Sequence, residues 1–387
     1  MCIRVRQQIN LSRKLAIFSL SSGKTILWII PLICFLLILL IPLNKLEMNP
    51  TQMYSEKYTS FGPDVLWLDK KLGASFPISF KATSDNGSVS NPRFLEGLDN
   101  FSIWLEEQKE VTHVTSLART MKSLNKSMHG DDLKMKVIPE DQELSSQYLF
   151  FYEMSLPMGL DLNTSISQDR GSTRIAATLR EMTSKEYLIF DEKVTKYLRE
   201  NNLESTISKP AGFRVIFVYL MEAIVNSLLV GVTIGLALII TVIGFFFRSA
   251  SFGFLSSFPN ILPIVSAFGI WAIIDGQIDF MVAVGMGSTL GIIVDFTVHL
   301  LSKYDLARQE LKKSPEDAVL FAFEAVGFAL IAMTIILALG FSVLHLVSFL
   351  PMHNFAQFSI LAFVFALIID FFLFPNLLVR FDKRKFD

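Results

Sequence analysis

The sequence predicts a multi-pass α-helical membrane protein with six transmembrane helices and an α/β domain of the ferredoxin-like, porter type between helices 1 and 2. Three observations predict this fold class. The chain of 387 residues is 51% hydrophobic and only 18% charged, with a mean hydropathy of +0.46. It contains six apolar stretches of membrane-spanning length, and one large polar region separates the first stretch from the other five. A soluble protein of this size carries more charge.

The six predicted spans follow from the thickness of the bilayer core, about 30 Å, which about 20 apolar residues cross as a helix. The first stretch, residues 25–43, is too long for a signal-peptide core. No small-x-small cleavage site follows it, so we expect an uncleaved anchor. The other five lie within a membrane region of residues 216–380, and they cover residues 224–247, 254–274, 280–301, 321–346 and 355–379.

Lysine and arginine residues predict the orientation of these spans. Residues 1–24 contain five basic and no acidic side chains, and the tail at 381–387 and the loop "SKYDLARQELKKSPED" also contain lysine and arginine. The short loops on the opposite side, "DGQID" and "SFLPMHN", contain neither lysine nor arginine. We therefore expect both termini to be cytoplasmic and residues 44–215 to be extracytoplasmic.

The polar region of residues 44–215 alternates strand-like and helix-like segments. "PISFKAT", "VTHVTSL", "STRIAATLR" and "ESTISK" are typical of strands, whereas "NPRFLEGLDNFSIWLEEQ", "DQELSSQYLFFYEMS" and "KEYLIFDEKVTKYLREN" are typical of helices. Pro92 suits the first turn of its helix. This alternation predicts small β-α-β sandwiches of the ferredoxin-like kind.

A polar stripe marks the fourth predicted span. Gly287, Gly291, Asp295 and His299 are each four residues apart, so they lie along one face of a helix. The glycines allow close approach of a neighbouring backbone, as small residues do in membranes. A charge at this depth costs about 3 kcal/mol. We therefore expect Asp295 to face protein and to be protonated much of the time or matched to a partner.

A carboxyl that alternates between protonation states could drive transport. The membrane potential contributes about 2.3 kcal/mol per charge per 100 mV. Asp295 is thus a candidate proton-relay residue, and its structural alternative is a protonated side chain that only hydrogen-bonds between helices. His299, one turn further on, is a weaker relay candidate that might instead anchor the helix end.

Two further polar residues lie inside predicted spans. Thr334 could donate a hydrogen bond to Asp295 or, equally, to its own helix backbone. Asp370 lies deep in the last span, where Pro375 predicts a disturbed helix end that water could reach. Both are weaker candidates for the proton relay.

Several other functions find little support in the sequence. "SLSSGKT" ends like a phosphate-binding loop, but Phe18 stands where the first glycine belongs and a membrane span follows, so ATP binding is not expected. The five histidines show no metal-ligand spacing, and we expect no metal and no cofactor beyond a proton gradient. No nucleophile–base pair suggests an enzyme, and no basic aromatic surface suggests nucleic acid as a partner.

Four segments, in order, resemble the resistance–nodulation–division (RND) superfamily of transporters, in particular its MMPL-type exporters. They are "FRSASFGFLSSFPNILPIVSAFGI", "GMGSTLGIIVDFTVHLLSKY", "ALGFSVLHLVSFLP" and "LIIDFFLFPNLLVRF". Segments of the polar region, such as "VTSLARTMKSLNKSMHG", are also similar. The resemblance implies a bacterial inner or plasma membrane protein that couples proton flux to export of a hydrophobic or lipid-like substrate, with Asp295 as the relay carboxyl. Many members have Asp or Tyr after this residue, whereas this chain has Phe296.

The resemblance covers one repeat, similar to the C-terminal repeat of members that carry two. Because transporter sites form at the repeat interface, a single repeat would leave the stripe from Gly287 to His299 facing lipid. We therefore expect a half-transporter that pairs with a second copy of itself or with a companion N-terminal-half protein, surrounded by membrane lipids. The alternatives are a non-transporting lipid- or sterol-sensing or protein-export accessory protein, and an inactive half of a split transporter.

Overall fold

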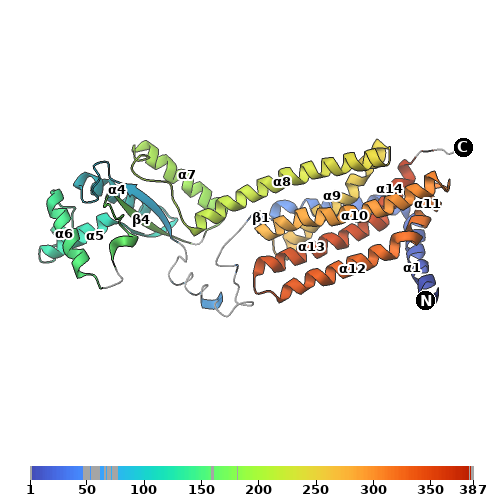
Figure 1. Ribbon diagram of the computed structural model, residues 1–387, viewed down its shortest axis with the longest axis horizontal. Coiled ribbons are helices and arrows are strands. Elements are labelled where there is room, and N and C mark those ends of the chain that lie inside the picture. The colour runs from blue at the N-terminus through green and yellow to red at the C-terminus, as the bar shows by residue number, and fades with distance from the viewer. Residues whose placement is uncertain are drawn as a thin grey trace. The chain divides into compact units, whose positions relative to one another are not determined.

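The computed structural model describes residues 2–46, 53, 62–64, 67, 71, 77–157, 161–180, 182–382 and 384, with side chains from residue 11 onward. It divides into two compact units, and each has its own buried core (Figure 1). The first unit combines Met1–Met48 with Met221–Asp387, and the second is Asn49–Leu220.

The second unit is built around an antiparallel sheet in the order β2-β4-β3, formed by β2 (Ile78–Thr83), β4 (Ser172–Leu179) and β3 (Val111–Thr115). Residues 207–211 add antiparallel bridges to the free edge of β2, at Ser79–Ala211 and Ala82–Ile207. The segment "ESTISK", expected to be a strand, therefore contributes only a bridge at Ile207, and the pairing runs beyond it.

Helices connect these strands on crossover paths. α4 (Pro92–Glu107) joins β2 to β3, and α7 (Ser184–Glu200) follows β4. Between β3 and β4 lie α5 (Leu117–Met128), η3 (Leu133–Met135), α6 (Gln142–Ser155) and η4 (Leu162–Thr164). The other strands and helices expected here are confirmed, except that the strand expected at "VTHVTSL" ends at Thr115. Helix α5 had not been expected. The segment "ESTISK" forms only the bridge described above.

Local capping explains where the two crossover helices begin. Asn91 accepts a hydrogen bond from the Phe94 amide, with Pro92 in the first turn as expected. Thr183 and Glu186 form a reciprocal capping box at the start of α7. Both helices then bury one apolar face, and Phe101 of α4 contacts Phe80 of β2 edge-to-face at 5.2 Å between ring centroids.

The first unit contains, among the described residues, six helices long and apolar enough to cross a membrane. Three are single helices: α8 (Phe213–Phe246), α9 (Ala250–Ile274) and α10 (Phe280–Gln309). Three are composite. They are α2 (Gly23–Ile38) with η1 (Ile41–Leu43); α11 (Pro315–Ala322), η5 (Phe323–Gly327), α12 (Phe328–Ser342) and η6 (Val343–Leu346); and α13 (Leu350–Ile368), η7 (Ile369–Leu373) and α14 (Phe374–Phe381). Two-residue strands β1 (Lys45–Leu46) and β5 (Gln277–Ile278) pair in parallel.

Several helices extend beyond the apolar stretches because their caps lie outside them. Ser314 caps the fifth span, which therefore begins at Pro315 and not near 321. α8 begins at Phe213, eleven residues before the expected span, and its first residues belong to the second unit.

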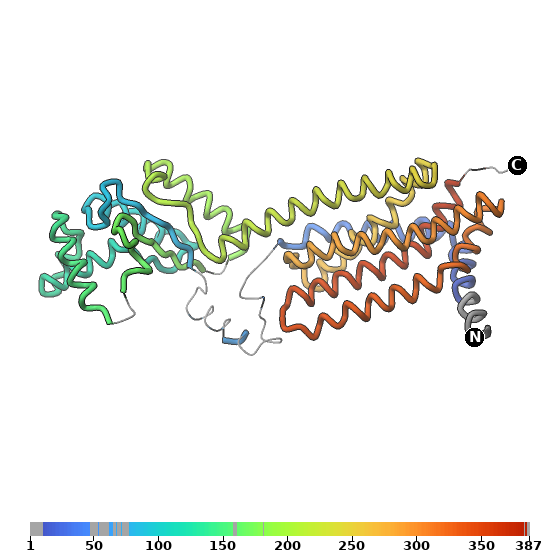
Figure 2. Tube along the Cα trace, viewed as in Figure 1, coloured from blue at the N-terminus to red at the C-terminus, as the bar shows by residue number. Residues whose placement is uncertain are grey.

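Helix α10 packs on α9, α11 and α13 (Figure 1). The trace follows α13, η7 and α14 as one continuous rod beside it (Figure 2). In α9, in α10 and in this rod, at least half of the residues in the most apolar segment are buried inside the protein. In α8 only 6% of such residues are buried. The bundle therefore has a packed interior and a large apolar surface.

Residues 1–24, expected to be a tail, are largely helical. Helix α1 (Cys2–Ser21) packs on η5 and η7 through the small buried residues Ser12, Ala16 and Ser19. Their spacing of four and three residues places them on one helix face. Helix α1 is not an apolar span, so hydropathy did not predict this contact.

Candidate functional site

One face of α10 carries the predicted stripe, and within this chain that face is exposed. Gly291, Asp295 and His299 are all exposed, and Gly287 is half-buried. A Cβ placed at Gly287 would meet only a methyl group of Leu228 at 3.7 Å, and one at Gly291 would meet nothing within 4 Å. The close backbone approach expected at these glycines is therefore not made by any described residue of this chain.

Asp295 lies on this exposed face without a partner in the described part of the chain, where it forms no hydrogen bond or ion pair. The next residue, Phe296, is fully buried in the bundle. The expectation that Asp295 faces protein is thus not met by this single chain. An ionised carboxyl that faced lipid at the centre of a span would cost about 3 kcal/mol.

The opposite face of α10 carries a second polar residue, Thr297, which is fully buried. Its hydroxyl lies 3.2 Å from Asp370 Oδ1 in η7 and 3.3 Å from Asn260 Oδ1 in α9. The Asn260 amide nitrogen donates to the Ser256 carbonyl at 2.7 Å. We call Asn260, Thr297 and Asp370 the interior triad.

Asp370 is the carboxyl of the interior triad, and it is fully buried. Its exposed fraction is zero, and its Oδ2 has no hydrogen-bond partner among the described residues. It lies in η7, a single π-helical turn, a feature often found at functional sites. Pro375 cannot donate a backbone hydrogen bond to the preceding turn, so the chain is disturbed where expected. Access to water, also expected, is wrong for this structure because the side chain is fully buried.

Thr334 belongs to neither group. Its hydroxyl donates to the Leu330 carbonyl of its own helix, α12, at 3.0 Å. The structure therefore places Asp295 and His299 together on the exposed face and Asp370 in the interior, with Thr334 apart from both. Asn260 and Thr297 were missed by the sequence interpretation, although each is a polar residue within a strongly apolar span.

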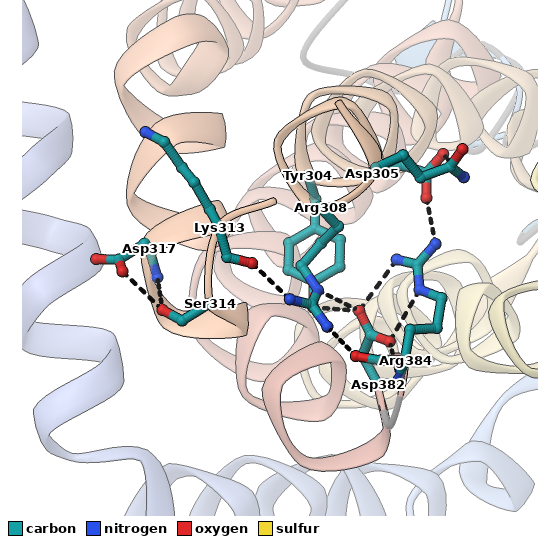
Figure 3. Close-up of polar contacts among 9 residues, drawn as sticks. Tyr304, Asp305, Arg308, Lys313, Ser314, Asp317, Asp382 and Arg384 are labelled. Carbon is teal, nitrogen blue, oxygen red and sulfur yellow. Dashed lines mark hydrogen bonds and ion pairs between the residues drawn. The ribbon is translucent and has the colours of Figure 1, made fainter. Parts of the chain in front are cut away.

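The last turn of α10 is joined to the end of α14 by an ionic cluster (Figure 3). Asp382 accepts hydrogen bonds from Tyr304 and from Arg308 Nε, each at 2.9 Å. Arg384 donates to Asp382 at 2.9 Å and to Asp305 at 2.6 Å. Burial alone would raise the pKa of Asp382, but the hydrogen bonds from Arg384, Arg308 and Tyr304 outweigh it and lower that pKa to about 2.

Metal-ligating side chains do not converge in the described residues, where no group of three His, Cys, Asp or Glu could hold an ion. Two carboxyls of the membrane unit, Asp295 and Asp370, lie within predicted spans on different helices and form no ion pair in the described residues. Asp295 is exposed on α10, and Asp370 is buried in η7.

Comparison with known proteins agrees with this architecture. The chain is a multi-pass membrane protein whose residues 92–385 match the model of the MMPL family. Because the match covers most of the chain, the protein belongs to the MMPL family, which confirms the resemblance drawn from the ordered motifs. Membership indicates a membrane transporter-like function.

One curated relative comes from Methanocaldococcus jannaschii and carries a provisional name as a membrane protein. It is 29% identical over 154 residues, which is 39% of this chain and 39% of the relative. The match thus spans about two fifths of the relative's length.

Proposed function

We propose that this protein is a subunit of an exporter that uses the proton-motive force to move a hydrophobic or lipid-like molecule, with Asp295 as the proton-carrying residue. The observation that carries the proposal is the exposed, unpartnered position of Asp295 on α10, the most extensively packed helix of the bundle along with α13. Membership of the MMPL family supports the transporter class.

The exposed face of α10 is best explained by a second repeat that covers it. Ser288, Gly291, Asp295, His299 and Ser302 are exposed at spacings of three and four residues, so they form one polar line along the helix. Small residues on such a line allow close helix packing in membranes. We propose that a second copy of this chain, or a companion repeat of the N-terminal type, packs on this line.

Within that interface Asp295 would exchange its proton. A carboxyl between two protein surfaces can be neutral or paired in different conformations, and each state favours a different packing. His299 lies one turn away on the same face and is positioned to extend the proton path. The membrane potential then supplies about 2.3 kcal/mol per charge per 100 mV.

The polar unit is proposed to be the extracytoplasmic porter domain of this exporter. Its sheet has the order β2-β4-β3, and residues 207–211 bridge to the free edge of β2. This order, with α4 after β2 and α7 after β4, supports the proposed ferredoxin-like fold. The basic residues of 1–24, the α10–α11 loop and the C-terminal tail favour a cytoplasmic location for both termini in a bacterial inner or plasma membrane.

A groove between α2, α9 and the end of the sixth span supports the proposal of a hydrophobic substrate. Its volume is about 270 Å³, and its lining is almost wholly apolar. Leu27 and Cys34 of α2 face Leu262 of α9 and Leu377 of α14 there. An acyl chain suits such a surface better than any polar solute.

Transport in proteoliposomes with an imposed pH gradient tests the proposal, with release of fluorescent lipid-like substrates as the measurement. Asp295→Asn should abolish gradient-dependent transport because an amide cannot carry the proton, while thermal stability stays close to that of the wild type. Glu316→Gln, an exposed acidic residue next to the fifth span, is the matched control and should transport normally. Unchanged transport by Asp295→Asn would reject the relay. Gradient-independent lipid binding without transport would favour a sensing role.

A further inference from the structure

We propose that the Thr297 hydroxyl is a hydrogen-bond switch that responds to the protonation of Asp370 inside the repeat. The interior triad brings together three elements far apart in the chain: Asn260 from α9, Thr297 from α10 and Asp370 from η7. Asp370 is a different carboxyl from Asp295. It contacts the face of α10 opposite to Asp295.

The geometry gives one donor two competing acceptors. A threonine hydroxyl has a single hydrogen to donate. Asn260 Oδ1 at 3.3 Å and Asp370 Oδ1 at 3.2 Å lie almost equally far from it. Asn260 cannot turn its own amide to the hydroxyl without losing the 2.7 Å bond to the Ser256 carbonyl. The hydroxyl therefore serves one acceptor at a time.

Protonation of Asp370 decides which acceptor is served. A carboxylate is a much stronger acceptor than a neutral amide, so the ionised form draws the Thr297 hydrogen to Asp370. The neutral acid is a weaker acceptor, and the hydrogen then turns to Asn260. On ionisation the proton leaves Asp370 for water, which reaches this buried carboxyl only when the bundle opens transiently, and Thr297 then changes acceptor.

The surroundings of Asp370 make the neutral form the resting one. It is fully buried, and an unpaired buried charge is costly. On the helices packed against η7, the ionisable groups near its level are Cys34 of α2, which packs on Ile369, and Asp295 and His299, which face away on the other side of α10. The basic residues lie elsewhere: Arg13 pairs with Glu324, and Lys24, Lys303 and Arg380 lie near helix ends.

The switch would change how α10 is held. In one state Thr297 ties α10 to α9, and in the other it ties α10 to η7. Because Asp295 lies two residues from Thr297, a shift of α10 moves the proposed relay carboxyl. This last step depends on the proposed function, whereas the switch itself does not.

Infrared spectroscopy of the full chain in nanodiscs tests the switch through the C=O stretching band of a protonated carboxyl, followed as pH is raised. We expect a band that persists at neutral pH, is lost in Asp370→Asn and remains in Asp295→Asn. Thr297→Val should leave its frequency nearly unchanged, because Thr297 does not bond the neutral acid, and should move its disappearance to higher pH, because the ionised form loses its donor. Thr297→Ser, which keeps the hydroxyl, should restore the wild-type band.

Two results would overturn the proposal: a neutral-pH band that survives Asp370→Asn, or a Thr297→Val band that disappears at the same pH as in the wild type. Because the Thr and Val side chains are nearly isosteric, the second result does not depend on a destabilised variant. In proteoliposomes Thr297→Val should slow gradient-driven transport by about tenfold and Thr297→Ser should not. A wild type that shows the band but no transport would reject the proposed function and leave the switch standing.

Discussion

Asp295 and Thr297 are separated by one residue but face opposite sides of α10. Two residues correspond to a rotation of about 200° on an α-helix. One side chain is therefore exposed on the outer surface of the bundle, and the other is buried against α9 and η7. The same short segment thus contributes to two polar sites that cannot share a hydrogen bond. This separation is why the carboxyls Asp295 and Asp370 are assigned different roles.

Asp382 is a third carboxyl with a distinct environment, outside the spans. Arg308 and Tyr304 of α10 and Arg384 beyond α14 all donate to it. Its side chain is only 1% exposed, and that of Arg308 is 6% exposed, so this ion pair is shielded from solvent. Such a pair holds two helix ends together, and removing one partner leaves a buried charge.

The lowered pKa of Asp382 predicts a specific pH dependence. Its folded-state pKa is about 2, below the usual value of about 4 in an unfolded chain, so its contribution is fully present above pH 4 and is lost as pH falls towards 2. The contribution is about 2 kcal/mol. Thermal unfolding in detergent between pH 6 and pH 2, values chosen to bracket these pKa values, should show this loss in the wild type.

Asp382→Asn should remove that acid-dependent step and cost about 3 kcal/mol at neutral pH. Glu316→Gln should change neither the stability nor its pH dependence, because Glu316 is exposed. An Asp382→Asn profile parallel to the wild-type profile would show that Asp382 is not the titrating group.

At the scale of elements, glycines distinguish the packed faces of the helices from the exposed one. A Cβ on Gly269 of α9 would overlap the Leu37 carbonyl of α2, and one on Gly253 would overlap the Ile240 carbonyl of α8. By contrast, a Cβ on Gly291 of α10 would meet no atom within 4 Å. Gly269 and Gly253 are required for contacts within the chain, whereas Gly291 has no such role there.

Gly291→Leu therefore tests whether a second repeat covers α10. Within the single chain the substitution should leave thermal stability unchanged or raise it by up to about 1 kcal/mol, since glycine is a poor helix former. Across a close helix–helix interface it should weaken association by steric overlap. Native mass spectrometry in mild detergent measures the paired fraction.

The matched control for this experiment is Gly269→Leu, which should destabilise the chain itself by disrupting the contact of α2 with α9. Association that is equally strong in the wild type and in Gly291→Leu would show that this face of α10 is not the interface.

At the scale of the whole molecule, the two units have separate cores. The core of the polar unit includes Phe80, Phe101, Tyr187 and Phe190, and it continues into Val218 at the start of α8. That helix then continues into the membrane unit, whose core is a different set of residues. A unit with its own core is expected to fold alone.

Residues 77–220 expressed without the membrane spans should therefore fold as a soluble α/β domain with one cooperative thermal transition, followed by circular dichroism. Val218→Asp should destabilise this domain by more than about 2 kcal/mol, because Val218 is 3% exposed and the charge would be buried. Ile216→Asp, at a position that is 62% exposed on the same helix, should have little effect. Equal effects of the two substitutions would contradict the assigned core.

The sequence by itself determined the six apolar spans and most strands and helices of the polar unit, because hydropathy, periodicity and capping act over neighbouring residues. The order of four short motifs along the chain was also enough to indicate the MMPL family. Only the tertiary structure decided that the Asp295 face of α10 is exposed and that Asp370 meets Thr297 and Asn260. Those contacts join residues 37 and 73 positions apart, and they depend on helix rotation and on the π-turn at Asp370, which no local pattern specifies.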